Sequence, residues 1–317
     1  MTHKPLAIVI PAYKQTFLRA TLQSIAAQTC HDFTLYIGDD YSPHQLKAVV
    51  DEFADDIDIV YHRFEQNLGG HDLVAQWERC IAMTDDEPYI WLFSDDDMME
   101  PRCVEHYLAL TPEQRDNYLV HFDLAVIDEF NHATVTQQQP YPDIMDAKDF
   151  LEEKLKINGK RGLESFIVEF VFSRTVYEQN GHFENYDLAW GSDFITWLKF
   201  ASAGRGILTV KQEDSKVMWR KSSENITPDE SHPILIRKLR SLTHNAAYIQ
   251  RWLPAYGYAP SFRYTKFVWG NIKGNTQTLS FSEILSLAKL YTSEVGHRFL
   301  ASLALVAVLV KKILKLT

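Results

Sequence analysis

The stretch "LAIVIPAYKQTFLRATLQSIAAQT", residues 6–29, decides the fold class. Its first five residues are apolar and read as a buried strand, and after a Pro-containing loop the apolar residues recur with the 3.6-residue period of a helix. The same alternation continues to residue 93. It predicts strands at 33–37, 57–64 and 89–93, and helices at 16–27, 44–54 and 72–83. Strands that alternate with helices predict an α/β fold with a mostly parallel central sheet covered by helices on both faces.

The composition narrows the class of protein. The chain has 317 residues, of which 46% are hydrophobic, so it is long enough to bury a large core. Its formal charge of -10 argues against a nucleic-acid-binding protein, which usually carries a basic face. Three widely spaced cysteines indicate a reducing compartment, and no signal peptide precedes the first predicted strand. These features predict a cytoplasmic location.

Charge is unevenly distributed along the chain. Residues 230–317 carry 12 Lys and Arg against 3 acidic residues, a net charge of +9, and residues 1–229 carry 20 basic and 39 acidic residues, a net charge of −19. A basic end on an acidic body predicts that this end alone meets an anionic surface or partner.

The second informative stretch is "WLFSDDDMMEP", residues 91–101, in which a predicted strand ends in three adjacent carboxylates. Like charges placed side by side repel, and burial increases the cost. One explanation is a divalent cation, because Mg²⁺ or Mn²⁺ is typically held by one or two carboxylates together with substrate phosphates. The other is a solvated acidic turn that caps the helix expected after Pro101.

The surrounding motifs separate these explanations. There is no G-x-G-x-x-G after the first strand and no Walker-type Gly-Lys-Ser/Thr, which disfavours dinucleotide and P-loop sites. Instead "IVIPAYKQTFLRATLQSIAAQT", "DFTLYIGDDYSP", "NLGG" and "PYIWLFSDDDMMEP" follow one another. This series resembles the inverting glycosyltransferases of family two, whose catalytic domain has the GT-A fold. The resemblance covers roughly residues 5–225.

The resemblance implies a donor site. It assigns to the nucleotide-sugar pocket Pro11, Ala12, Tyr13, Asp39, Asp40, Asn67, Gly69, Asp95 and Arg220. In the family, the acidic pair that matches "DD" in "DDYS" lies beside the base and ribose, where a carboxylate accepts the uracil N–H. Counted back from the proline, the register makes Asp96 the ligand for Mn²⁺ or Mg²⁺ and places Asp95 at the ribose, and Asp97 serves either as a second metal ligand or at the ribose.

The resemblance also implies a general base. Asp193, in "WGSDFITW", matches the acidic residue that takes the acceptor proton, although Ser192 stands where the family usually has Glu. A helix N-cap is the alternative role for Asp193. Trp190 and His182 are candidate acceptor contacts, with ordinary core and loop roles as alternatives. Arg220 is either a partner of the diphosphate or a surface arginine.

Two units are expected: a catalytic domain over residues 1–228, divided into a nucleotide-binding half (1–100) and an acceptor half (101–228), and a helical, basic and aromatic extension over 229–317. The apolar run at 299–310 is too short to span a bilayer. Aromatic and basic side chains favour a membrane surface, so the extension is expected to bind the inner face of the cell membrane, with packing on the catalytic domain or on a second subunit of a homodimer as alternatives.

Together these features predict a metal-dependent inverting glycosyltransferase of bacterial cell-surface polysaccharide synthesis. It would move a sugar from a nucleotide-sugar, with UDP favoured, to a glycan or lipid-linked glycan acceptor. The alternatives are a sugar nucleotidyltransferase, disfavoured by the missing Gly-rich basic loop, and a non-catalytic scaffold of a polysaccharide-assembly complex.

Overall fold

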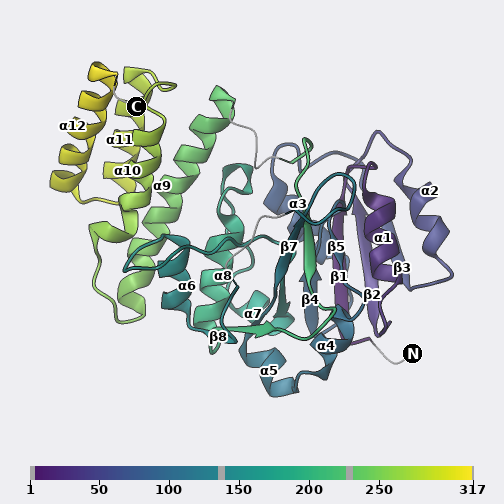
Figure 1. Ribbon diagram of the computed structural model, residues 1–317. Coiled ribbons are helices and arrows are strands. Elements are labelled where there is room, and N and C mark those ends of the chain that lie inside the picture. The colour runs from purple at the N-terminus through teal and green to yellow at the C-terminus, as the bar shows by residue number, and fades with distance from the viewer. Residues whose placement is uncertain (1–3, 135–139, 226–230, 316–317) are drawn as a thin grey trace.

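The computed structural model describes residues 4–134, 140–225 and 231–315. The predicted fold class is confirmed: an eight-stranded sheet, in the order β3-β2-β1-β4-β9-β6-β10-β8, is flanked by helices (Figure 1). In that order the strands are Ile59–Arg63, Phe33–Asp39, Leu6–Ala12, Tyr89–Leu92, Phe170–Ser173, Leu119–Phe122, Ile207–Val210 and Ile144–Met145.

The first four strands are parallel, as predicted, with β1 between β2 and β4. The sheet then changes direction, because β9 lies antiparallel between β4 and β6. A second, three-stranded sheet in the order β5-β11-β7 consists of Met98–Met99, Val217–Arg220 and Leu124–Ile127. It pairs the chain just after the acidic triplet with β11, so it fixes the end of the loop that follows β4.

Helices cover both faces of the large sheet. Those up to residue 203 are α1 (Leu18–Ala26), α2 (Leu46–Val50), α3 (Leu73–Ile81), α4 (Cys103–Ala109), α5 (Pro112–Asn117), α6 (Ala147–Lys154), α7 (Arg174–Gln179) and α8 (Ser192–Ala203). Apolar residues of α1, α2 and α4 belong to one buried cluster, and those of α3, α6, α7 and α8 belong to a second cluster on the opposite face. Short 3-10 turns are formed by Asp51–Phe53, Asp187–Ala189 and Phe262–Thr265.

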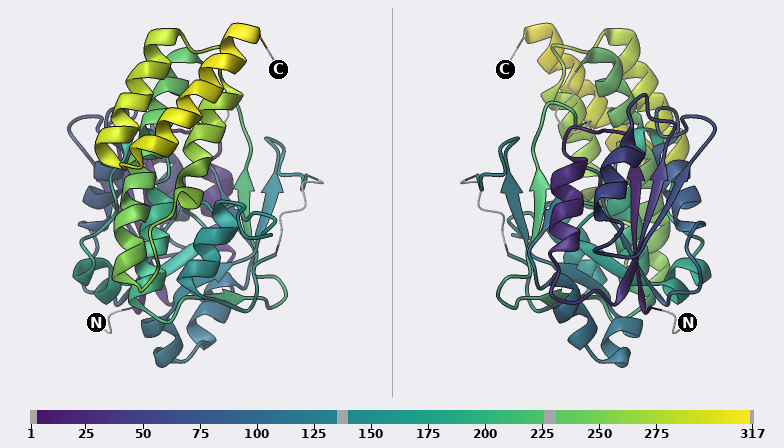
Figure 2. Two further views of the ribbon diagram at one scale, coloured as in Figure 1. Left: turned by 90° about the vertical axis from the view of Figure 1, so that its left-hand side faces the viewer. Right: turned by 90° about the vertical axis from the view of Figure 1, so that its right-hand side faces the viewer.

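The C-terminal region is helical, as predicted. It forms a bundle beside α6 and α8, made of α9 (His232–Ala255), α10 (Lys266–Gly274), α11 (Phe281–Glu294) and α12 (Arg298–Leu314) (Figures 1 and 2). The predicted boundary at 228/229 lies outside the described residues. Helix α9 contributes to two cores: Ile249, Trp252 and Leu253 pack in the cluster of α3 and α8, and Leu239 and Ala246 pack in the bundle's own cluster.

The aromatic residues of this region point mostly inward. Trp252, Tyr264 and Trp269 are buried, so the expectation that the aromatic stretch lies at a membrane surface is wrong for these three. Most of the exposed large apolar residues of this region lie on α12, and the others are Tyr256, Phe281 and Leu285. No helix within the described residues is long and apolar enough to cross a membrane.

Candidate active site

The carboxyl ends of β1, β2 and β4 open into a cavity of about 1220 Å³. This is where ligands bind in open α/β sheets. Its lining includes eleven of the predicted site residues, namely Pro11, Ala12, Tyr13, Asp40, Asn67, Gly69, Asp95, Asp96, Asp97, Trp190 and Asp193. Residues from strand ends, α8 and the C-terminal helices therefore meet around one space.

Three predicted site residues are not among the residues that line the cavity. Asp39 is fully buried, accepting hydrogen bonds from the backbone N–H of Ser42 (2.8 Å), from Arg63 (2.9 Å) and from the Tyr61 hydroxyl. His182 stacks on Tyr177 and lies 3.1 Å from Glu78. The third, Arg220, is buried behind the acidic triplet.

Asp40 holds the "NLGG" turn in place. Its Oδ1 accepts from the backbone N–H of Leu68 (2.7 Å) and pairs with Arg79, and its Oδ2 accepts from Asn67 Nδ2 (2.8 Å) and from the backbone N–H of Gly69 (2.8 Å). All four contacts are within the protein, so Asp40 shapes the wall of the cavity through this turn. A methyl group on Gly69 would lie 2.8 Å from Asp40 Oδ2, which explains the glycine.

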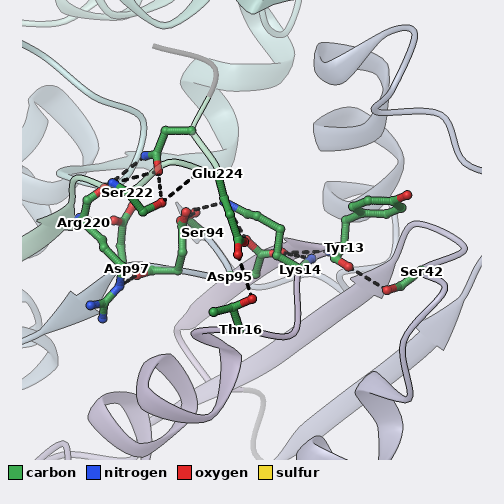
Figure 3. A network of polar contacts seen from close by, with 12 residues as sticks. Tyr13, Lys14, Thr16, Ser42, Ser94, Asp95, Asp97, Arg220, Ser222 and Glu224 are labelled. Atoms are coloured by element: carbon green, nitrogen blue, oxygen red, sulfur yellow. Dashed lines mark hydrogen bonds and ion pairs between the residues drawn. The ribbon is translucent and has the colours of Figure 1, made fainter. Parts of the chain in front are cut away.

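The acidic triplet is buried, and Figure 3 shows Asp95 and Asp97 with their partners. Asp95 Oδ2 accepts from the backbone N–H groups of Tyr13 (2.8 Å) and Lys14 (2.7 Å), which ties the β4 end to the loop after β1. The Lys14 ammonium lies 3.4 Å from Asp95 Oδ1 and forms a close ion pair with Asp96 Oδ2. Asp97 Oδ1 accepts from the backbone N–H of Arg220 (2.7 Å).

Arg220 fixes the backbone of the acidic triplet through hydrogen bonds. Its Nε donates to the carbonyl of Asp96 (2.7 Å), its Nη1 donates to the carbonyl of Asp128 (2.8 Å), and its guanidinium lies over Phe17. Its Nη2 is buried without a partner among the described residues. Arg220 is thus neither a surface residue nor a lining residue of the cavity, and it positions the acidic loop.

Burial and mutual repulsion change the protonation of these groups. Burial, together with the neighbouring Asp96, raises the pKa of Asp95 to about 6 and that of Asp97 well above its usual value. Burial alone would lower the pKa of Lys14, but Asp95 and Asp96 raise it above its ordinary value. The lysine therefore stays charged and offsets part of the repulsion among the carboxylates.

The acidic side chains at the end of β4 are the candidate ligands for a divalent cation. Within residues 4–134, 140–225 and 231–315 no group of three or more His, Cys, Asp or Glu side chains could hold a metal ion. Two carboxylate oxygens, Asp95 Oδ1 and Asp96 Oδ2, do converge on one cationic group. This pair fits Mg²⁺ or Mn²⁺ when substrate phosphates complete the coordination. Asp95 therefore shares a cationic partner with Asp96, whereas Asp97 Oδ1 accepts a hydrogen bond from the backbone of Arg220, and the pair Asp96 and Asp97 as metal ligands stays a prediction.

Asp193 lies in the first turn of α8 and faces the cavity. Its pKa is raised to about 6, by burial first, while the positive charge of Lys154 opposes the rise. The N-cap of α8 is Gly191, which has φ 82, so Asp193 is not the helix cap. Ser192 accepts a hydrogen bond from the backbone N–H of Tyr186 (3.0 Å) and so holds the loop before the helix.

Several lining residues were not predicted. Among them are Lys14, Gln76, Trp77, Lys154, Trp219, Glu224, Leu242, Asn245, Phe267 and Asn271. Lys14 stands directly after the predicted loop residues, so its place in the sequence was a usable signal. The last four come from α9 and α10, and nothing in their local sequence indicates a site more than 200 residues from the first strand.

Comparison with known proteins agrees with this geometry. A family model described as "Glycosyl transferase family 2" matches residues 7–172, more than half of the chain. The chain belongs to this family. It is a glycosyltransferase, and the matched segment holds both acidic motifs and the "NLGG" turn but ends before Asp193.

Solved structures share the fold of this glycosyltransferase. S. aureus TarS 1-349 in complex with UDP-GlcNAc is 12% identical with a TM-score of 0.60, and the match covers 97% of this chain and 88% of that one. A second TarS 1-349 structure gives a TM-score of 0.63 at the same identity and coverage. GalNAc-T7 with UDP, GalNAc and Mn²⁺ is 16% identical with a TM-score of 0.56, covering 92% of this chain and 55% of that one. Among the curated proteins, none matches the chain.

Proposed function

We propose that the protein is a metal-dependent inverting glycosyltransferase that uses a UDP-sugar to extend a glycan or lipid-linked glycan in cell-surface polysaccharide synthesis. The observation that supports it is the presence of two kinds of carboxylate in one cavity. Asp95 and Asp96 share a cationic partner at the end of β4, and Asp193 opens α8 with a raised pKa. Asp95 and Asp96 suit the binding of a metal and a diphosphate, and Asp193 suits the role of a general base.

The chain's own residues have separate tasks in the reaction. The ionised Asp193 accepts the proton of the acceptor hydroxyl while that oxygen forms a bond to the anomeric carbon. The bond from that carbon to the diphosphate oxygen breaks, and the diphosphate leaves with the electron pair. A bound divalent cation supplies Lewis-acid stabilisation of that leaving group. Lys14 is available to pair with the same phosphates, and attack from the opposite face turns an α-linked donor into a β-linked product.

Calorimetry with UDP-, GDP- and dTDP-sugars tests the donor site. We expect one UDP-sugar to bind in Mn²⁺ or Mg²⁺ and to bind at least tenfold more weakly in EDTA, since two carboxylates bind the diphosphate poorly without a cation. A preference for GDP- or dTDP-sugars would change the nucleotide but keep the reaction. If the folded protein, with metal present, failed to bind every class of donor, the proposal of an enzyme would give way to that of a non-catalytic scaffold.

We further propose that α12 rests on the inner face of the cell membrane. Its exposed apolar residues recur every three or four positions and form a strip along one face of the helix: Phe299, Leu303, Val306, Val310 and Ile313. The helix has no acidic residue, and Lys311, Lys312 and Lys315 lie near its end. A basic helix with an apolar face is typical of binding to anionic lipid.

Vesicle co-sedimentation tests this surface. Wild-type protein is expected to bind phosphatidylglycerol-containing vesicles, more weakly at high salt, and Leu303→Ser with Val306→Ser is expected to lower binding at least tenfold because apolar area is lost. A matched change on the α11 surface, Leu285→Ser, serves as the control. A concentration-dependent dimer that the double variant abolishes, without vesicle binding, would assign the strip to a second subunit instead.

A further inference from the structure

Helix α9 holds the loop that leads to Asp193. Arg237 pairs with both carboxylate oxygens of Asp187, through Nε to Oδ2 (2.9 Å) and Nη2 to Oδ1 (2.6 Å). One turn further on, Ser241 Oγ donates to the Asp187 carbonyl (2.9 Å). These contacts restrain a loop in which Leu188 and Ala189 have positive φ angles of 60° and 52°, and the two-point pair of Arg237 with Asp187 makes most of them.

The same face of α9 continues to Trp190 and Gly191. The Lys238 ammonium lies 4.3 Å from the centre of the Trp190 ring, and Asn245 Nδ2 donates to the Trp190 carbonyl (3.3 Å). A methyl group on Gly191 would lie 2.0 Å from Asn245 Nδ2, so the loop and the amide are in direct contact. Positions 237, 241 and 245 are four residues apart and therefore share one face of the helix. The amide of Asn245 thus contacts Gly191, which lies two positions before the proposed base Asp193 in the sequence.

The second polar atom of Asn245 lacks a hydrogen-bond partner among the residues that the structure describes. Its side chain is buried, and Oδ1 accepts no hydrogen bond within the described residues although Asn245 lines the cavity. The contact of Nδ2 with a carbonyl oxygen fixes the orientation of the amide, because only the NH₂ group can donate there. A buried acceptor of this kind is unfavourable unless a ligand or an ordered water supplies a donor.

The cavity that Asn245 lines has walls that suit a sugar ring. Trp190, Leu242 and Phe267 provide apolar surface, and Asn271 adds a polar group from α10. Small-molecule sites commonly combine apolar and aromatic walls with a few placed polar groups. A pyranose has hydroxyl donors on its edge and C–H groups on its faces, which matches this mixture.

We propose that the C-terminal helices build the acceptor subsite, and that Asn245 Oδ1 accepts a hydrogen bond from a hydroxyl of an acceptor pyranose lying beside Asp193. The inference rests on the proposed function and adds to it. The acceptor half of the site is then shared between the α8 region and the C-terminal extension. Asn245 binds a hydroxyl of the acceptor and does not take part in proton transfer.

Saturation-transfer NMR with UDP and metal bound tests this subsite. The probes are methyl β-D-glucopyranoside, methyl β-D-galactopyranoside and methyl N-acetyl-β-D-glucosaminide. We expect the wild type to bind at least one of them, and Asn245→Ala to bind it about tenfold more weakly, the loss expected for one hydrogen bond. The affinity for UDP is expected to stay within twofold, which also shows that the variant is folded.

Ser241→Ala is the matched control. It removes one contact between α9 and the loop, but Ser241 is not among the residues that line the cavity, so glycoside binding is expected to remain near the wild-type level. The inference is overturned if Asn245→Ala binds the glycosides as the wild type does, if Ser241→Ala weakens them equally, or if the wild type binds UDP but none of the three. Failure to bind UDP and every nucleotide-sugar would overturn the proposed function itself, and the inference with it.

Discussion

Replacement of Asp193 by Asn is expected to lower kcat by about 100- to 10,000-fold, the range typical of a lost general base. Asn keeps the size of the side chain and can still accept hydrogen bonds, but it cannot take the acceptor proton. Donor affinity is expected to stay within about twofold, because the acidic pair at the β4 end is untouched. Steady-state kinetics with calorimetry of the donor measure both quantities.

The pH profile gives an independent test of the same residue. Burial raises the pKa of Asp193 to about 6, and only the ionised form acts as a base. The rate is therefore expected to fall about tenfold per pH unit below pH 6 and to level off above it. Lys154→Met removes the positive charge that opposes the rise in the pKa of Asp193. The acidic limb of the pH–rate profile is therefore expected to move to higher pH. A variant Asp193→Asn with near-normal kcat and an unchanged limb would assign the base to another group.

The second large effect is expected at Asp96. Asp96→Asn is predicted to lower kcat/KM by about 100- to 1,000-fold, because metal stabilisation of a leaving group contributes several kcal/mol and each 1.4 kcal/mol is a factor of ten. The amide is a weaker ligand for a hard cation and forms no ion pair with Lys14. Electron paramagnetic resonance of free Mn²⁺, with and without UDP, measures the metal affinity directly. Equal Mn²⁺ affinity in variant and wild type would exclude Asp96 as a ligand.

Lys14→Met is the informative counterpart. The ammonium lies against the same two oxygens that would bind the metal, so lysine and cation compete for them. Without UDP, Mn²⁺ is therefore expected to bind the Lys14→Met variant more tightly than the wild type. With UDP present the difference is expected to shrink, since the phosphates offer the displaced ammonium a new partner. Weaker Mn²⁺ binding in Lys14→Met would show that the lysine supports the metal site.

The first half of the fold was predictable because its elements carry strong local patterns. The apolar runs of β1, β2 and β4 and the periodic helices between them leave few alternatives. The direction of β9 was not predictable, since a short apolar strand contains no information on which neighbours it pairs with. The bounds of α10 were missed because it begins without a side-chain cap, whereas the capping box of Ser280 and Glu283 was a usable start signal for α11.

The site was predictable where function is concentrated in adjacent residues. The triplet at 95–97 stood out by charge and position, whereas Asp193 was assigned only through the resemblance to the family; both reach the cavity. The roles of Asp39 and Asp40 were harder to judge, because only the structure shows that hydrogen bonds within the protein already occupy their oxygens. Asn245 carries no local signal, since its place depends on how α9 packs against a loop more than 50 residues earlier.

The shared helix α9 has a consequence for folding. Because its later turns complete the core beneath α8 while its middle completes the core of the bundle, neither part has a finished interior alone. Such a molecule should melt as one cooperative unit, with a single calorimetric transition. A chain shortened before residue 231 would lack the partners of the sheet's helical layer, and its loss of activity would report on instability as much as on lost contacts.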